Sequence, residues 1–173
     1  MDLLSAPVKR GNHRNYLALV AIALLISCGY TAGSLLPKHI KKVYIPTFEN
    51  ETTRYGIEQE LTARVAEAFT ADNRLLVVGE SEADALLRGV IVEYSKGALT
   101  FDRAQTVDEF KVEIVVSVEF EDLREGKVLW KEPEFRAWES YSDTGEEPGE
   151  EAALETAIKT LAADMLSRTM EGW

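Results

Sequence analysis

The sequence predicts an α+β fold in which a mostly antiparallel or mixed sheet of four to five strands carries two helices on one face. Apolar side chains recur at every fourth position from Ile57 to Phe69, as on the buried face of a helix, and a second helical pattern runs from Leu154 to Met165. Between them, residues 109–121 alternate between apolar and polar side chains, which is typical of a strand with one buried face. The expected element order is β-α-β-β-β-β-α.

The first 27 residues have the features of a bacterial lipoprotein signal peptide. A basic patch (Lys9, Arg10, His13 and Arg14) precedes an 11-residue apolar segment, Tyr16 to Ile26. As a helix this segment would reach about 17 Å, too short for a hydrocarbon core of about 30 Å. The segment ends in the four residues of a predicted lipobox: Leu25, Ile26, Ser27 and Cys28.

A lipobox implies cleavage after Ser27 and attachment of a diacylglycerol to the Cys28 thiol. The alternative interpretation is a buried structural cysteine, since free Cys is a common core residue. Cys28 is the only cysteine of the chain, so lipidation would leave no thiol for a disulfide. The fold would then depend on packing alone.

The expected mature chain has one lipidated N-terminus with a short tether (28–40) and one globular domain (41–173). Its net charge is −13, because the removed leader contributes +2 to the net charge of −11 of the whole sequence. Such a chain should repel nucleic acid and gain nothing from anionic lipid surfaces. Membrane attachment would therefore rest on the acyl chains of Cys28.

The domain begins with a predicted strand at Lys42–Phe48, which Pro46 either ends or places at a sheet edge. A turn at Asn50–Arg54 precedes the first helix, which should end near Asp72 and Asn73. A short strand at Leu75–Val78 follows.

The next strand, Ala85–Tyr94, is apolar on both faces, which favours a central position covered on both sides. We expect Gly97 to interrupt it as a bulge or bend. Glu109–Glu121 is the clearest strand of the sequence, with a core face (Phe110 to Phe120) and a solvated face that carries Lys111, Glu113, Ser117, Glu119 and Glu121.

A hairpin turn is predicted at 122–126, with Gly126 late in the loop. In the returning strand, Val128 and Trp130 share one parity, whereas Phe135 and Ala137 share the other, so we expect a bulge at Pro133. An acidic loop (142–149) leads to the last helix, Glu150–Met170. Its first turn holds Glu150 and Glu151, at the positive end of the helix dipole.

The mature chain contains no recognisable catalytic motif, so we expect no enzyme, no catalytic residue, no metal site and no cofactor other than the covalent lipid on Cys28. His39 lacks Cys or His neighbours. Four glutamates (Glu146, Glu147, Glu150 and Glu151) lack the spacing and glycine of a calcium loop. Three tryptophans (Trp130, Trp138 and Trp173) are best explained as core or edge packing.

Several segments together resemble the LptE-like family of lipopolysaccharide-assembly outer-membrane lipoproteins. They are Cys28-Gly-Tyr30, Leu36-Pro-Lys-His-Ile-Lys41, residues 43–52 (VYIPTFENET), Tyr55-Gly-Ile-Glu58 with Leu61-Thr62, Ser81-Glu-Ala-Asp84 with Leu87 and Gly89, residues 122–130 (DLREGKVLW) and Glu171-Gly-Trp173. The ordered set covers essentially all of residues 28–173.

The resemblance implies a non-enzymatic lipoprotein on the periplasmic face of the outer membrane. It also implies that the protein is a plug inside a large β-barrel translocon and binds this barrel one to one. The plug would assist barrel assembly and lipopolysaccharide delivery. Lipopolysaccharide is a candidate ligand; Lys96, Arg103 and Lys111 flank one inter-strand loop but are better explained as solvated charges, so no lipopolysaccharide-binding residue is assigned. The alternative function is a lipoprotein that regulates a peptidoglycan synthase or forms part of a secretion pore.

Overall fold

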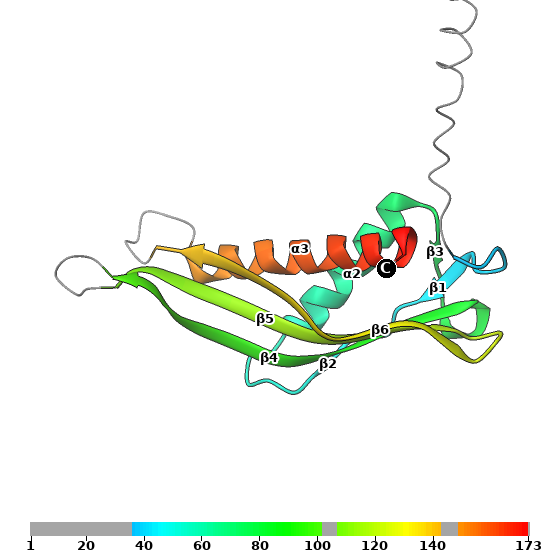
Figure 1. Ribbon diagram of the computed structural model, residues 1–173, viewed down its shortest axis with the longest axis horizontal. Coiled ribbons are helices and arrows are strands. Elements are labelled where there is room, and N and C mark those ends of the chain that lie inside the picture. Colours follow the sequence, from blue (N-terminus) through cyan, green and yellow to red (C-terminus); the bar gives the residue numbers. More distant parts are fainter. Residues whose placement is uncertain (1–35, 102–106, 143–148, 173) are drawn as a thin grey trace, which may run out of the picture. The chain divides into compact units, whose positions relative to one another are not determined.

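The computed structural model describes residues 36–101, 107–142 and 149–172, which form a sheet with two helices (Figure 1). The elements are, in chain order, β1 (Lys42–Tyr44), β2 (Glu49–Asn50), α2 (Ile57–Asp72), β3 (Leu76–Val77), a 3-10 turn (Glu80–Glu82), β4 (Ala85–Phe101), β5 (Val107–Asp122), β6 (Lys127–Tyr141) and α3 (Glu150–Glu171). The expected α+β class and, in outline, the element order are confirmed. The sheet has six strands because the short strand β2, beyond the end of the predicted first strand, adds to the five expected.

The sheet is mixed. Its strand order is β3-β1-β4-β5-β6, and β2 pairs with β4 beyond the end of β1. The pairs β1–β3, β1–β4 and β2–β4 are parallel, whereas β4–β5 and β5–β6 are long antiparallel pairs. The antiparallel half follows directly from consecutive hairpins, and the parallel half from the return of the chain through α2.

Both helices lie on the same face of the sheet, with α3 along β5 and β6 and α2 beside α3 (Figure 1). The predicted periodic positions are buried, including Leu61 and Phe69 of α2 and Ile158 and Met165 of α3. They meet the alternate residues of β5 from Val112 to Phe120, all of which are at most 1% exposed. The predicted core faces of α2, β5 and α3 are therefore confirmed.

The prediction that β4 is covered on both sides is wrong. Ala85, Leu87 and Ile91 are fully buried beneath the helices, but Leu86 and Val90 are only half-buried and Val92 is 40% exposed. β4 is an inner strand of the sheet, yet no described helix covers its second face, so that face remains open.

Gly97 does not interrupt β4, which continues to Phe101 with Gly97 opposite Lys111. The irregularities lie to either side, between Ile91 and Glu93 and between Ala98 and Thr100. In β6 the expected bulge at Pro133 is confirmed, since Glu132 pairs with Val118 and Phe135 with Val116.

A second bulge in β6, at Leu129, overturns the prediction that Val128 and Trp130 share a face. The extra residue reverses the parity, so Val128 is 45% exposed while Trp130 is 4% exposed.

Pro46 ends β1 rather than placing it at an edge, because β1 lies between β3 and β4. The chain bulges out at 45–48 and resumes pairing at Glu49. There the Phe48 ring covers the backbone of Gly89 so closely that a Cβ atom on Gly89 would lie 2.7 Å from the ring. Gly89 is therefore required by this close approach.

Candidate functional site

The predicted lipobox residues Leu25, Ile26, Ser27 and Cys28 lie outside the described residues, as does the first part of the tether. From Leu36 onward the chain already contacts the domain, since Leu36 packs against the core and Ile40 is 5% exposed. Lipidation of Cys28 remains a prediction.

The open face of the sheet carries a row of ion pairs across three strands. Arg88 of β4, Glu119 of β5 and Lys131 of β6 are direct cross-strand neighbours. Glu119 is paired with both cations, with Lys131 Nζ 2.9 Å from its Oε2. Lys131 and Arg88 together outweigh the effect of burial and lower the pKa of the Glu119 carboxyl.

A second group of charges lies further along the same face. Glu113 contacts Lys111 at 2.8 Å and Arg136 at 3.6 Å. Lys111 Nζ also lies 5.3 Å from the centre of the Trp138 ring, which is half-exposed. Val115 lies on the same face between its cross-strand neighbours Glu93 and Arg136, and it is only 4% exposed. The charged side chains of these two groups therefore compensate each other.

A shallow groove of about 360 Å³ lies on this face where β1 and β2 separate. Its walls combine apolar side chains (Tyr44, Pro46, Leu86 and Leu123) with Arg88 and Glu49. A smaller depression of about 120 Å³ shares Glu49, Arg88 and Gly89 with the groove and extends it toward Lys131. Among the described residues that line the groove, no nucleophile is in contact with a base.

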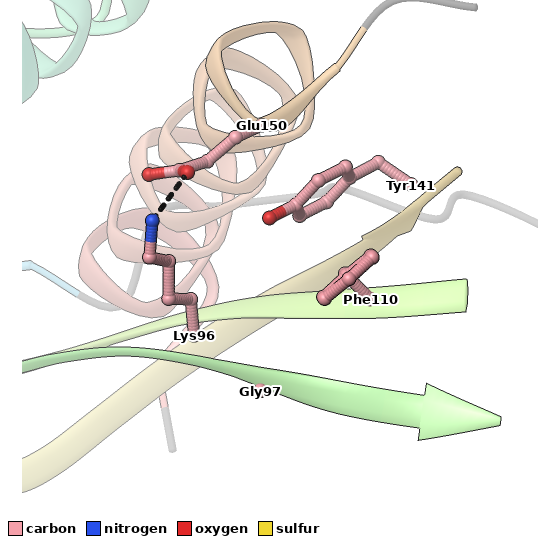
Figure 2. A pocket seen from close by; sticks show the side chains of 5 residues that line it. All are labelled: Lys96, Gly97, Phe110, Tyr141 and Glu150. Carbon is pink, nitrogen blue, oxygen red and sulfur yellow. Dashed lines mark hydrogen bonds and ion pairs between the residues drawn. The ribbon is translucent and has the colours of Figure 1, made fainter. Parts of the chain in front are cut away.

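A cavity of about 350 Å³ lies between the start of α3 and the far ends of β4–β6 (Figure 2). Phe110 and Tyr141 form one wall, with ring centroids 5.5 Å apart. On the opposite side Glu150 accepts hydrogen bonds from Tyr94 Oη at 2.5 Å and Lys96 Nζ at 3.0 Å. These bonds lower the pKa of the Glu150 carboxyl, the bond from Tyr94 most.

The predicted basic residues are not brought together. Lys96 is paired with Glu150 on the helix side of the sheet, whereas Lys111 is paired with Glu113 on the open face. Arg103, Glu146, Glu147 and Trp173 lie outside the described residues. Within the described lining of the cavity, the one cation is already neutralised.

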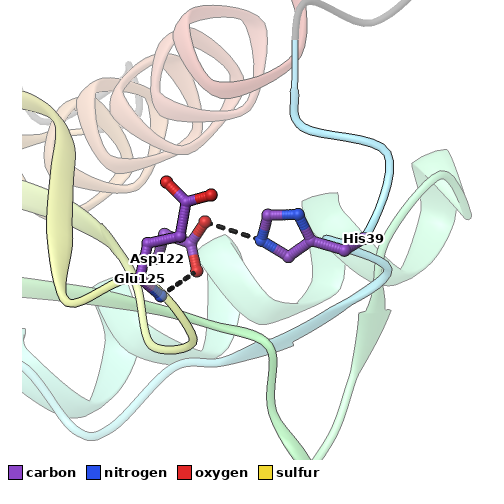
Figure 3. A group of neighbouring side chains, drawn as sticks. All are labelled: His39, Asp122 and Glu125. Atoms are coloured by element: carbon purple, nitrogen blue, oxygen red, sulfur yellow. Dashed lines mark hydrogen bonds and ion pairs between the residues drawn. The ribbon is translucent and has the colours of Figure 1, made fainter.

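His39 is placed against the β5–β6 turn, where it meets Asp122 and Glu125 (Figure 3). His39 Nε2 lies 2.6 Å from Asp122 Oδ2, and the other oxygen of Asp122 accepts the backbone N–H groups of Arg124 and Glu125. Asp122 is completely buried. Sequence reasoning missed this pair because its members are 83 residues apart.

The three side chains at the β5–β6 turn offer one imidazole and two carboxylates within 4.8 Å of one another, a donor set that can bind a divalent metal. In this structure His39 and Asp122 satisfy each other, and both oxygens of Asp122 are occupied. His39 and Asp122 therefore form a hydrogen-bonded link between the start of the domain and the β5–β6 turn.

Neither described helix is long and apolar enough to span a bilayer. The described residues form an α+β domain in which two helices cover one face of a mixed sheet, and the other face carries compensated charges and shallow grooves.

The chain belongs to the LptE family, described as lipopolysaccharide-assembly, whose sequence profile matches residues 40–169. It is therefore a lipopolysaccharide-assembly lipoprotein. No curated protein matches it in sequence.

Solved structures share the fold at low sequence identity. One is the protein XCC0632 of Xanthomonas campestris, with a TM-score of 0.57 and 13% identity over 76% of this chain and 84% of that one. A hypothetical protein of Chlamydia trachomatis has a TM-score of 0.56 and 12% identity over 75% of this chain and 95% of that one. A PelC dodecamer from Paraburkholderia phytofirmans has a TM-score of 0.52 and 18% identity over 81% and 96%, respectively.

Proposed function

We propose that this chain is anchored by acyl chains on Cys28 to the periplasmic face of the outer membrane and plugs the lumen of a large β-barrel. The barrel exports lipopolysaccharide. The plug binds the barrel one to one and assists both the assembly of the barrel and the delivery of lipopolysaccharide. Membership of the lipopolysaccharide-assembly family supports this role. The observation that carries it is the open sheet face with its internally paired charges.

A plug must lie against a wall that is itself polar, because the interior of an outer-membrane barrel is polar. Burying an unpaired charge against such a wall would cost several kcal/mol, on the order of 3–5 kcal/mol for a broken buried pair. On this face four cations (Arg88, Lys131, Lys111 and Arg136) are paired with four carboxylates (Glu119, Glu121, Glu113 and Glu134) before any partner arrives. The face can therefore be covered by a polar partner without leaving a bare charge.

Direct binding of lipopolysaccharide has less support at Lys96 and Lys111. Its phosphates would need unpaired cations, but Lys96 and Lys111 are both engaged by carboxylates. We therefore assign no lipopolysaccharide-binding residue.

The proposal is tested by purifying the tagged, lipidated protein from detergent-solubilised outer membranes and identifying the captured proteins by mass. A large β-barrel recovered in equal amount is the expected result. Recovery of a peptidoglycan synthase, or of a ring made of this chain alone, would overturn the plug role in favour of a regulator or a pore component.

A further inference from the structure

Tyr55 is the most exposed large hydrophobic side chain of the described chain, at 91%. It lies in the segment from Asn50 to Gly56, between β2 and α2, and makes no hydrogen bond or ring contact with any described residue. Single exposed apolar residues are common on protein surfaces. Tyr55 differs from them because hydrogen bonds and an ion pair hold the loop that carries it in place.

Asn50 holds the loop from within. Its amide nitrogen donates to the carbonyl of Arg54 and to Glu58 Oε2, both at 2.8 Å. Its amide oxygen accepts the backbone N–H of Thr52 at 2.9 Å and the hydroxyl of Thr52 at 2.7 Å. These four hydrogen bonds connect the two ends of the loop through the Asn50 side chain.

Further contacts fasten the loop to the rest of the domain. The backbone N–H of Glu51 donates to the carbonyl of Ile91 in β4 at 3.0 Å. The Arg54 guanidinium is paired with Glu151 of α3 and lies 5.8 Å from the centre of the Tyr94 ring. Gly56, at φ 89°, then turns the chain into α2. Sheet and helix together hold the backbone of Tyr55 in one position.

A rigidly presented tyrosine is suited to anchor a protein partner. Binding normally costs about 0.5–1.5 kcal/mol for each side chain that must be immobilised, and more when a loop must be ordered as well. The loop of Tyr55 is ordered already, and the phenol has few rotatable bonds. Tyrosines in such settings are enriched among the residues that dominate interfaces.

The charges around Tyr55 indicate the kind of partner. Glu51 is exposed in the loop and the carboxylate of Glu58 lies at its end, whereas Arg54 and Glu151 neutralise each other. This acidic surrounding repels anionic lipid headgroups and nucleic acid phosphates. A protein pocket with an apolar floor and lysine or arginine at its rim complements it.

We infer that the loop from Asn50 to Gly56 is an anchoring site, in which Tyr55 inserts into an apolar, basic-rimmed pocket on the inner wall of the barrel partner. The inference rests on the proposed plug function and adds the place of contact to it. The open sheet face and the Tyr55 loop are then two separate parts of one interface.

A photo-crosslinking experiment in intact cells tests the site directly. The crosslinking residue p-benzoylphenylalanine replaces Tyr55 in the full lipidated chain, and in a control chain it replaces Leu76, which is 54% exposed on β3. We expect position 55 to give a crosslink to the barrel, identified by mass, at least about tenfold stronger than position 76. An equal or weaker crosslink at position 55 would overturn the inference.

Two substitutions measure the contribution of the ring. Tyr55→Ala should lower the amount of barrel retained during purification by roughly thirtyfold, the effect of losing a strong interface residue. Tyr55→Phe should stay within about threefold of the wild type, since the ring carries the contact. Both variants should unfold in urea like the wild type, because the side chain is exposed.

The outcomes separate the inference from the proposed function. If the wild type captures the barrel and Tyr55→Ala captures it equally well, the anchoring site is wrong and the plug function stands. If the wild type captures no barrel, the plug function itself fails. A loss that occurs only together with unfolding of the domain, with no crosslink at position 55, would also count against the anchoring site.

Discussion

At Gly89 the strand β4 has no side chain because the ring of Phe48 occupies that space. A Cβ atom would lie 2.7 and 2.8 Å from two ring carbons, well inside normal contact. Phe48 is 2% exposed and held in the core, so the ring has little freedom to retreat. The bulge of residues 45–48 and the glycine therefore belong to one packing arrangement.

We expect Gly89→Ala to destabilise the domain by about 1–3 kcal/mol, the usual cost of overpacking a filled site. Urea unfolding at constant m-value measures the loss. Gly97→Ala is the matched control, since it is in the same strand and nothing lies within 4 Å of its Cβ position. Equal unfolding midpoints for the two variants would contradict the packing argument.

Asp122 connects the beginning of the domain to the β5–β6 turn. Burial alone would raise the pKa of its carboxyl, but hydrogen bonds from the Glu125 N–H, His39 and the Arg124 N–H together bring the pKa below its ordinary value of 3.8. A carboxyl whose pKa is lower in the folded state stabilises the fold above its unfolded pKa. That contribution disappears as the pH falls through the folded pKa.

Asp122→Asn should therefore lose about 1–3 kcal/mol of stability at neutral pH, the cost of weakening a buried hydrogen-bonded charge. Below pH 3.8, its free energy of unfolding should also change less with pH than that of the wild type. Urea unfolding across this acid range measures both effects. Glu125→Gln retains the backbone N–H and serves as control; a wild-type pH dependence in Asp122→Asn would refute the assignment.

At the scale of elements, the row Arg88–Glu119–Lys131 joins β4, β5 and β6 through one central carboxylate. The two cations flank Glu119 in direct register. Removal of its charge leaves Lys131 without its partner and leaves Arg88 with only the longer pair to Glu121, at 3.7 Å. The stability of the open face should therefore depend on salt.

Glu119→Gln should cost about 0.5–1 kcal/mol at low ionic strength, because the participating cations are more than half exposed and their pairs are screened. The difference from the wild type should shrink as the salt concentration rises from about 0.1 M to about 1 M. Urea titrations at both salt concentrations test this. Glu139→Gln on β6, which has no ion pair with a described residue, should show neither effect.

The elements that were predicted well are those in which one face meets the core. The alternation in β5 and the four-residue spacing in α2 and α3 directly record burial against a single neighbouring layer. β4 was misread because Leu86, Val90 and Val92 are apolar on a face that no described helix covers. Hydrophobicity reports the preference of a residue for burial, and the partner that satisfies it need not belong to the same chain.

Contacts between distant segments were beyond sequence reasoning. The bulge at Leu129 carries no proline or glycine that would mark it, in contrast to the one at Pro133. The meeting of His39 with Asp122, and of Arg54 with Glu151, requires the fold to be known first. The turn at Asn50 was predicted, but the exposure of Tyr55 depends on how that turn is fastened to β4 and α3.

At the scale of the whole molecule, we expect a strongly acidic domain to depend on the proposed lipid on Cys28 for membrane attachment, because its charge does not attract anionic lipid. Cys28→Ala should leave the chain unlipidated and move it to the soluble periplasmic fraction. Fractionation after a high-salt wash, in cells depleted of the barrel partner, measures this. Outer-membrane retention of the variant under these conditions would contradict lipid anchoring.

The place of β1 inside the sheet also determines how the domain bears mechanical load. Its backbone is bonded to β3 on one side and to the 84–86 segment on the other, and the Asp84 carboxylate accepts the N–H groups of Lys41 and Lys42 at 3.0 Å. A pull exerted through the residues before Leu36 reaches the His39–Asp122 pair and these parallel bonds first. Because these bonds bear the force at the same time, a pull on the N-terminal end should not unfold the domain residue by residue from that end.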